Sequence, residues 1–293
     1  MLSEYRTLFD ARGARYNAAN RLYPDARAEE ARRILALMPL GAGALWLDVG
    51  AGGGFLGTRA EQAPAEQRSP GAAAVGCDES AVFLGDAGGY AMRTVAAFDR
   101  LPFAPGSFDA AASLAALHHA EEPRAAIAEM LRVVREGGRV AVGDVAAGSA
   151  AAGFLNEFVN AHTGSGHRGR FYRPDDWVGL LTAAGGRGAE ASTELVHWRF
   201  ASAGDAARFC RELFGLDPDT REDSLEAALD GLGGFARDGG WLLPWEMVFA
   251  TAVPVSAPTK LAVADMRMAC SGLSARVETD VAIALAVSWK PLM

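Results

Sequence analysis

Lysine is nearly absent from the chain. Among 293 residues only Lys260 and Lys290 occur, and every basic residue before position 253 is arginine or histidine. This shift in composition marks residues 254–293 as a C-terminal tail apart from the rest of the chain, with no role that the sequence assigns. A basic surface is lacking as well, since the formal net charge is −8. That charge excludes the usual nucleic-acid-binding proteins, which need a basic face.

Cysteine is scarce, and long apolar runs are missing. Cys77, Cys210 and Cys270 are scattered and odd in number, which indicates a reducing compartment rather than a disulfide framework. The N-terminus lacks the apolar core of a signal peptide. The longest apolar run of the tail, residues 281–289, is too short to span a bilayer. We therefore expect a cytoplasmic protein with no membrane partner.

Glycine, by contrast, is abundant at one informative place. An apolar run from Leu45 ends in Asp48, and glycines follow at alternate positions, Gly50, Gly52 and Gly54. A short apolar run bounded by glycines predicts a buried parallel strand. Glycine lets the backbone turn tightly and approach a ligand, and a following helix would point its free N–H groups at that ligand. The stretch therefore predicts the cofactor loop of an α/β fold.

Two cofactors are compatible with this loop. Residues 52–57 match G-x-G-x-x-G, the dinucleotide fingerprint, which is a weak signal in a chain with 34 glycines. Residues 48–54 match D-x-G-x-G-x-G. Asp48 favours the second pattern, because a carboxylate repels a pyrophosphate but attracts the ammonium and sulfonium groups of S-adenosylmethionine. A helix-capping aspartate in a glycine-rich turn is the purely structural alternative.

A second acid supports an adenosine ligand. Asp78 ends the predicted strand over residues 73–78, and an acid about twenty residues past such a loop can bind both hydroxyls of a ribose. S-adenosylmethionine and NAD both contain this ribose, so Asp78 does not distinguish between them.

The block over residues 101–145 is more specific. It contains an L-P-F turn, a G-S-F-D strand, L-H-H and L-R-V-V-R-E-G-G-R, which begin at residues 101, 106, 117 and 131. With the D-x-G-x-G-x-G loop, this block resembles the class I S-adenosylmethionine-dependent methyltransferases of the ubiquinone/menaquinone C-methylase type (methyltransferase type 11 domain). The resemblance implies S-adenosyl-L-methionine as cofactor. It also implies an α/β, Rossmann-like, doubly wound seven-stranded sheet in the order 3-2-1-4-5-7-6.

The resemblance also suggests which residues contact the adenosine. The sequence D-E-S from Asp78 is similar to the family's D-x-S, although Glu79 stands where the family usually has an apolar residue against the adenine. Ala97 stands where the family commonly has an aspartate for the adenine amino group. We expect Asp99 to substitute for it, with the backbone of Phe98 flanking the ring.

Other segments follow from the same comparison. Ser113 and Leu114 are expected to bind the cofactor. They also begin the place where nucleic-acid amino methyltransferases carry N-P-P-Y, and the lack of that motif speaks against DNA, RNA or protein-glutamine substrates. Residues 1–40 are predicted to form a helical lid that places the ring of Tyr16 over the sulfonium; a half-buried helix position is the alternative. The methyltransferase domain then covers residues 41–253, with helical insertions at about 148–173 and 203–238, the second roofing the site.

Histidines are the candidate catalytic residues. Methyl transfer needs the nucleophile about 3–3.5 Å from the methyl group and a base only when the nucleophile is protonated. His118 and His119 follow the fourth strand, and His167 lies in the loop after the fifth, so all three are expected at the reactive edge of the sheet. A helix-capping pair and a solvated loop are the structural alternatives. With no acid at ligand spacing, we predict no metal site.

These observations predict a methyltransferase, monomeric or homodimeric, that acts on a small-molecule acceptor in biosynthesis or secondary metabolism. Three alternatives stay open. An enzyme of the same fold could use S-adenosylmethionine for cyclisation or aminopropyl-arm cleavage without methyl transfer. A non-catalytic S-adenosylmethionine-binding module and an NAD-binding oxidoreductase are the other two.

Overall fold

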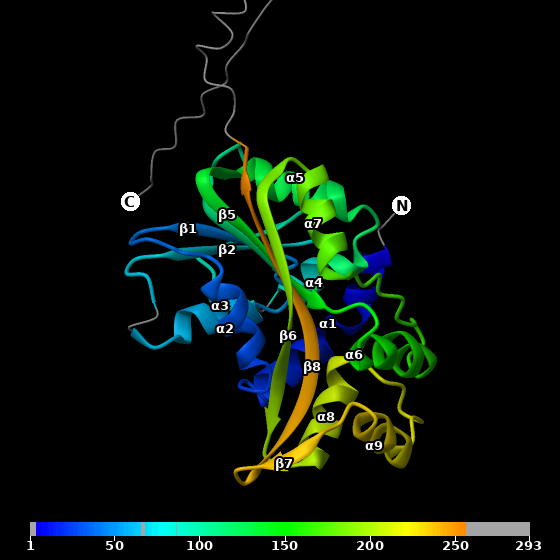
Figure 1. Ribbon diagram of the computed structural model, residues 1–293. Coiled ribbons are helices and arrows are strands. Elements are labelled where there is room, and N and C mark those ends of the chain that lie inside the picture. Colours follow the sequence, from blue (N-terminus) through cyan, green and yellow to red (C-terminus); the bar gives the residue numbers. More distant parts are fainter. Residues whose placement is uncertain (1–3, 66–67, 86, 256–293) are drawn as a thin grey trace, which may run out of the picture. The chain divides into compact units, whose positions relative to one another are not determined.

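A computed structural model describes residues 4–65, 68–85 and 87–255 (Figure 1). Cys270 and nearly all of the predicted C-terminal tail lie outside the described residues. The described chain forms a mixed eight-stranded sheet whose long strands follow the order β3-β2-β1-β4-β5-β8-β6, with the short strand β7 paired to β8. The predicted α/β doubly wound class is therefore confirmed.

Five parallel strands build one half of the sheet, and three antiparallel strands complete it. The parallel strands are β1 (Leu45–Val49), β2 (Ala73–Asp78), β3 (Met92–Val95), β4 (Phe108–Leu114) and β5 (Val134–Val145). The others are β6 (Gly186–Phe200), β7 (Phe235–Arg237) and β8 (Gly240–Pro254). Strands β1 and β4 are almost entirely buried, as expected for parallel strands covered by helices on both faces.

The strand order differs from the predicted one only by the addition of β7. Counting β8 as the seventh long strand reproduces 3-2-1-4-5-7-6. The sequence pattern also predicts a helix over residues 224–235, and this prediction is wrong at its end, because α9 (Glu222–Asp230) stops at Asp230 and Phe235 already begins β7. Gly233 explains the stop: its φ of +81° is incompatible with a right-handed helix and is readily adopted only by glycine.

Helices cover both faces of this sheet (Figure 1). On one face α5 (Pro123–Val133) and α7 (Pro174–Ala183) bury Ile127 and Trp177 against the strands. On the other face α2 (Ala28–Ala36) buries Ile34 against β4, β5 and β6. Because side chains alternate along a strand, neighbouring residues of β1 point toward the helical layers on opposite faces of the sheet. The shorter elements are α3 (Phe55–Gln62), α4 (Ala81–Leu84), α6 (Ala150–Gly153), the 3-10 turn η2 (Leu117–His119) and the π-helical turn η3 (Phe154–Val159).

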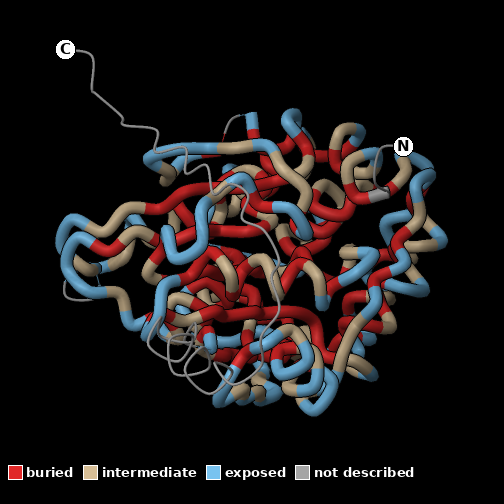
Figure 2. The backbone as a smooth tube through the Cα atoms, turned by 90° about the horizontal axis from the view of Figure 1, so that it is seen from above, coloured by how far each residue is buried: buried red, intermediate tan, exposed pale blue. Residues whose placement is uncertain are grey.

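Helix α1 (Glu4–Leu22) lies between α4 and the inserted helix α8 (Ala203–Leu213). Helix α9 (Glu222–Asp230) packs against α8. Long strands β6 and β8 carry these helices beyond the parallel part of the sheet, where Trp198 stacks on Trp245 with ring centroids 4.1 Å apart. Figure 2 shows the buried chain in the middle of the molecule with exposed segments around it. Among the described residues, no helix has the length and apolar character needed to cross a membrane.

Candidate active site

The glycine loop joins β1 to α3 in a left-handed backbone conformation. Gly50 and Gly54 have φ values of +80° and +84°, which side chains with a Cβ rarely adopt. A Cβ on Gly50 would lie 2.3 Å from the Cβ of Ala116, and one on Gly53 would lie 1.9 Å from Oδ1 of Asn17. The loop is thus enclosed by the segment after β4 on one side and by α1 on the other.

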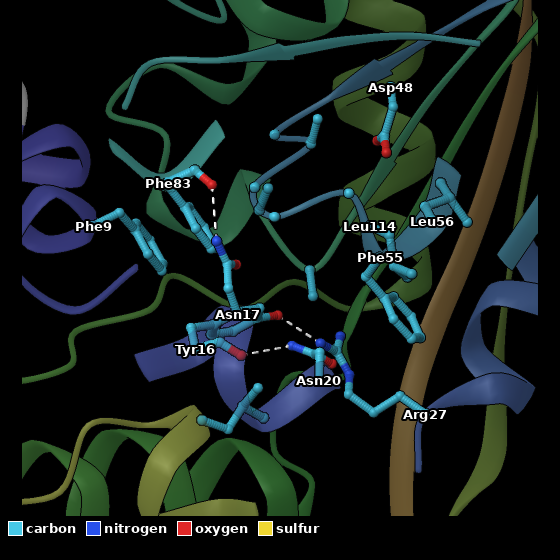
Figure 3. A pocket seen from close by; sticks show the side chains of 18 of the residues that line it. Phe9, Tyr16, Asn17, Asn20, Arg27, Asp48, Phe55, Leu56, Phe83 and Leu114 are labelled. Atoms are coloured by element: carbon cyan, nitrogen blue, oxygen red, sulfur yellow. Dashed lines mark hydrogen bonds between the residues drawn. The ribbon is translucent and has the colours of Figure 1, made fainter. Parts of the chain in front are cut away.

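A cavity of about 480 Å³ opens beside this loop (Figure 3). Its size falls within the range of about 300–1,000 Å³ that is usual for small-molecule sites. Aromatic side chains from four elements of the chain line it, namely Phe9, Phe55, Trp198 and Trp245. Nine of the predicted site residues line the cavity: Tyr16, Asp48, Gly50, Gly52, Gly54, Leu114, His118, His119 and His167.

The predicted ribose acid is already occupied by the chain itself. Asp78 is fully buried and does not line the cavity. Its Oδ2 accepts hydrogen bonds from the Tyr5 hydroxyl at 2.8 Å and from the Gly52 N–H at 2.9 Å, and its Oδ1 accepts from the Ser80 N–H at 2.9 Å. Burial raises the pKa of Asp78 to about 6, against the lowering effect of these donors. A ribose can reach this carboxylate only if Tyr5 withdraws.

The predicted adenine region is occupied in the same way. The Glu79 carboxylate accepts a 3.3 Å hydrogen bond from the Phe98 N–H. The ring of Tyr5 packs edge-on against Phe98 at 4.9 Å, and the ring of Phe9 stacks on Phe83 at 4.6 Å. Two aromatic residues of α1 therefore cover the segments expected to contact the adenosine, and no sequence pattern had singled out Tyr5.

Two further predicted contacts lie away from the cavity. Asp99 is exposed, so its side chain does not take part in the wall. Ser113 is buried in β4, and its Oγ has no hydrogen-bond partner among the described residues. Both side chains therefore lie outside the cavity wall, and their contacts with the cofactor stay predictions.

Asp48 is the acid that the cavity does present. It is 2 % exposed, and its Oδ2 accepts a 2.5 Å hydrogen bond from the Tyr90 hydroxyl. Burial raises the pKa of Asp48 to about 7, although the Tyr90 bond acts in the opposite direction. Near neutral pH this carboxyl can therefore change its charge, and a nearby cation would favour the ionised form.

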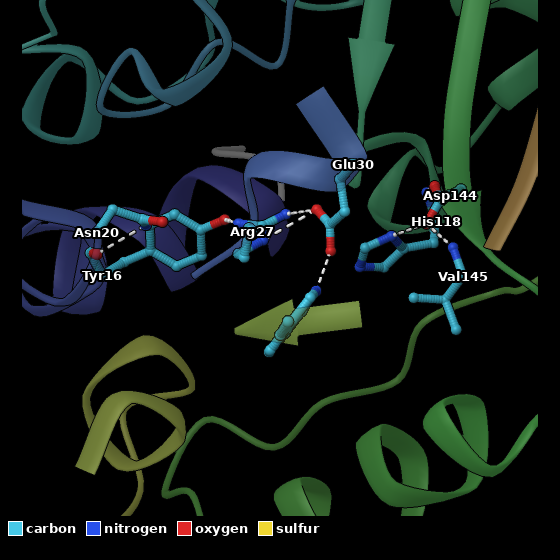
Figure 4. A network of polar contacts seen from close by, with 8 residues as sticks. Tyr16, Asn20, Arg27, Glu30, His118, Asp144 and Val145 are labelled. Atoms are coloured by element: carbon cyan, nitrogen blue, oxygen red, sulfur yellow. Dashed lines mark hydrogen bonds and ion pairs between the residues drawn. The ribbon is translucent and has the colours of Figure 1, made fainter. Parts of the chain in front are cut away.

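A buried ion pair holds Tyr16 at the opposite wall (Figure 4). Arg27 donates from Nη2 to Glu30 at 2.7 Å and from Nη1 to the Tyr16 hydroxyl at 2.5 Å. The other oxygen of Glu30 accepts from the indole N–H of Trp198. The guanidinium also lies 5.0 Å from the ring centroid of Phe55, a cation–π geometry. The network fixes α1 and β6 around the cavity and supplies Tyr16 with an internal cation.

Three histidines gather at another wall of the cavity. Ring centroids of His118 and His119 lie 4.1 Å apart, and that of His167 lies 5.6 Å and 5.2 Å from them. His118 Nδ1 is 2.7 Å from Oδ1 of Asp144, whose Oδ2 accepts from the His118 N–H. Sequence patterns missed Asp144, although β4 and β5 pair side by side so that residues near their carboxyl ends become neighbours.

Two of these histidines are neutral at physiological pH. Burial, followed by the neighbouring histidines, lowers the pKa of His119 well below its usual range. Burial and His118 lower the pKa of His167 to about 2. One nitrogen of each ring therefore carries a lone pair that can accept a hydrogen bond or bind a ligand.

Comparison with known proteins identifies the domain. Residues 47–142 match the family model for a methyltransferase domain. A putative methyltransferase from Bacillus halodurans has the same fold, with a TM-score of 0.55, 20 % identity, and coverage of 78 % of this chain and 100 % of that one. Residues 47–142 therefore match a methyltransferase domain.

Two other solved structures show the same fold. Phosphoethanolamine N-methyltransferase 2 from Haemonchus contortus, solved with S-adenosyl-L-methionine, has a TM-score of 0.57 and 18 % identity over 86 % of this chain and 60 % of that one. The [4+2]-cyclase SpnF has a TM-score of 0.51 and 20 % identity over 78 % of this chain and 82 % of that one. No curated protein matches the sequence.

The residues around the glycine loop fit S-adenosylmethionine. Asp48 and the glycine loop line the cavity, where a carboxylate suits a cationic ligand. Oδ1 of Asn17 is buried beside Gly53 without a hydrogen-bond partner among the described residues, so it can accept from a ligand N–H. Asp78 is the right residue type for the ribose, and it becomes available when Tyr5 gives up its hydrogen bond.

Proposed function

We propose that the chain transfers the methyl group of S-adenosylmethionine to a small-molecule acceptor in a biosynthetic or secondary-metabolic reaction. The observation that carries this proposal is the cavity that connects the glycine loop with three histidines. Its volume and aromatic walls suit a small molecule, and the bound cofactor would supply an activated methyl group. The net charge of −8 supports the view that nucleic acid is not the substrate.

The chain's own residues then hold and align the reactants. Asp48 and the glycine loop hold the cationic amino-acid part of the cofactor, because the carboxylate compensates positive charge. Buried aromatic side chains exclude water from the reacting groups. The histidines face the acceptor, and the carboxylate of Asp144 fixes the orientation of the His118 ring. In catalytic histidines, a hydrogen bond to one ring nitrogen determines in the same way which nitrogen is available for the reaction. Positioning of this kind supplies much of the rate of a displacement reaction.

A cyclisation is the second candidate, since the [4+2]-cyclase SpnF shares the fold. The products separate the two functions. Methyl transfer releases S-adenosylhomocysteine, whereas a cyclisation leaves the methyl group on the cofactor.

Calorimetry with S-adenosylmethionine tests the cofactor assignment. We expect Asp48→Ala to abolish binding, because it removes the only acid of the glycine-loop motif. Asp219→Ala is a matched control, since Asp219 is exposed and outside the cavity. If Asp48→Ala binds as tightly as the parent chain, the site is misassigned.

A further inference from the structure

We propose that His118, His119 and His167 bind a divalent transition-metal ion of the Zn²⁺ type at the acceptor side of the cavity. One ring nitrogen from each histidine lies within 4.8 Å of the other two. All three side chains line the cavity. The sequence had argued against a metal because it offered no acid at ligand spacing, but three imidazoles are a sufficient donor set for zinc.

The contacts of His118 leave one nitrogen free for a metal. Its Nδ1 lies 2.7 Å from Oδ1 of Asp144, and the carboxylate is itself fixed by the N–H groups of His118 and Val145. A carboxylate accepts and cannot donate, so the His118 proton is on Nδ1 and the lone pair is on Nε2. A histidine whose far nitrogen donates to a carboxylate is the arrangement that orients metal ligands in proteins.

Asn156 fixes His167 in the same tautomer. The Asn156 amide donates to the carbonyl of Gly169 at 2.9 Å and accepts from the N–H of Gly169 at 2.9 Å, so the positions of its oxygen and nitrogen are determined. Its Oδ1 lies 3.2 Å from Nδ1 of His167. Because that oxygen can only accept, Nδ1 of His167 carries the proton and Nε2 carries the lone pair.

The loop geometry brings the two rings together. A Cβ on Gly169 would lie 3.0 Å from Cδ2 of His118 and 3.0 Å from Cε1 of His167. The loop therefore packs closely on both imidazoles only because residue 169 is glycine. The Arg170 N–H also donates to the His118 carbonyl at 2.9 Å, which ties the loop to the turn that carries His118 and His119.

The spacing is close to that of a zinc site. Zn–N bonds of about 2.0–2.1 Å in tetrahedral geometry place ligand nitrogens about 3.4 Å apart. One ring nitrogen from each histidine already lies within 4.8 Å of the other two. Three histidines and one open position form the arrangement of catalytic zinc, and here the open position would face the cavity.

The neighbouring charge predicts what fills the open position. The guanidinium of Arg12 is buried and lines the same cavity as the three histidines. Its Nε has no hydrogen-bond partner among the described residues. A metal dication beside this cation requires an anionic fourth ligand. An acceptor with an acidic oxygen, bound between the metal and Arg12, satisfies both charges.

This assignment of the acceptor rests on the proposed methyl transfer. The metal would lower the pKa of the acceptor hydroxyl, whose proton leaves to solvent. The oxygen would then form the new bond to the methyl carbon, and the carbon–sulfur bond would break with its electron pair remaining on sulfur. The products are the methyl ether or ester and S-adenosylhomocysteine, and no oxidant or reductant is required.

Metal binding can be measured without any acceptor. Chelator-treated chain is titrated with Zn²⁺ by calorimetry, and Co²⁺ is added in parallel to record the visible absorption of a tetrahedral site. We expect one ion per chain and a tetrahedral cobalt spectrum. His119→Ala and His167→Ala should each lower zinc affinity at least 100-fold, and Asn156→Ala should lower it about 10- to 100-fold through the orientation of His167.

His162→Ala is the matched control. His162 lies in the same segment, but its Nδ1 contacts the Phe158 carbonyl and its side chain does not line the cavity. Zinc affinity of this variant should equal that of the parent. Circular dichroism of every variant separates lost metal binding from lost folding.

Two results would overturn the metal site: no zinc binding by the folded parent chain, or equal losses in His162→Ala and His167→Ala. The proposed methyl transfer is tested separately by S-adenosylmethionine binding to the chelator-treated chain. Cofactor binding without zinc binding leaves the methyltransferase assignment intact and rejects the metal. Zinc binding without cofactor binding supports the metal site and rejects the methyltransferase assignment.

Discussion

Gly53 of the glycine loop lies directly against the side-chain amide of Asn17 on α1. A Cβ at position 53 would come within 1.9 Å of Oδ1 of Asn17. The amide nitrogen donates a 3.0 Å hydrogen bond to the Phe83 carbonyl (Figure 3), so the side chain is held in place. This contact joins the N-terminal helix to the cofactor loop.

Gly53→Ala should therefore push α1 away from the loop. Overpacking of this kind costs about 1–3 kcal/mol of folding free energy, and we expect chemical denaturation to show that loss. Gly179→Ala is the matched control, because a Cβ there meets nothing within 4 Å and alanine is favoured in a helix. Equal stability of the two variants would refute the close contact.

Tyr5→Phe should increase the affinity for S-adenosylmethionine. The substitution removes the hydroxyl that occupies Asp78 and keeps the ring, so a ribose no longer competes with a 2.8 Å hydrogen bond. Loss of a bond to a charged group costs about 1.5–3 kcal/mol, which corresponds to at least a tenfold gain in affinity. Calorimetry provides the measurement. Tyr23→Phe removes a Tyr–Asp hydrogen bond outside this cavity and should leave the affinity unchanged. A weaker cofactor complex in Tyr5→Phe would contradict the competition.

Asp48→Asn should alter the pH dependence of stability. Because the pKa of Asp48 is about 7 in the folded chain and about 3.9 when unfolded, the folded state binds more protons between these values. The carboxyl therefore contributes less stability as pH rises. As the pH rises from 5 to 8, the free energy of unfolding of Asp48→Asn should increase by about 3 kcal/mol relative to that of the parent.

Chemical denaturation at both pH values provides this measurement. His119 and His167 have lowered pKa values and act in the opposite direction, but they contribute equally to both chains and cancel in the difference. A difference that stays constant from pH 5 to pH 8 would show that Asp48 does not titrate in this range.

Glu30→Ala should destabilise the fold strongly. The substitution leaves Arg27, which is 4 % exposed, as a buried charge without its carboxylate, and removal of one partner of a buried pair costs about 3–5 kcal/mol. Thermal unfolding should show a large decrease of the melting temperature. Asp223→Ala breaks the exposed pair with Arg221 and should change the melting temperature little. Similar shifts in the two variants would indicate that the Arg27–Glu30 pair is well solvated.

Local sequence signals predicted the first half of the sheet well. The second strand was predicted over residues 73–78 and has those bounds in the structure, because its apolar run is short and ends in Asp78. The helix after the glycine loop begins directly after Gly54, as expected from the left-handed turn. The sequence pattern predicts a strand only over residues 194–200, whereas β6 begins at Gly186, eight residues earlier. The first half of β6 is mostly exposed and contains Gly188, so it lacks the alternation of apolar and polar residues that predicts a strand.

The arrangement of the site depended on packing between distant segments. Tyr5 meets Asp78 across 73 residues of sequence, and the pattern of α1 gave no sign of which aromatic residue would turn inward. His118 and Asp144 meet because β4 and β5 are adjacent. Residue types predicted a cofactor loop and reactive histidines, but they could not predict that the chain's own side chains would occupy the ribose acid.

The packing of α1 over Asp78 also determines the order of events in solution. A cofactor that needs the open form binds only the fraction of molecules in which Tyr5 has left, so each 1.4 kcal/mol favouring the closed form lowers the apparent affinity tenfold. At high cofactor concentration the rate of loading would approach the opening rate of α1 and stop rising. An acceptor that binds only the open form would then increase the affinity for the cofactor. The cofactor would increase the affinity for that acceptor by the same factor.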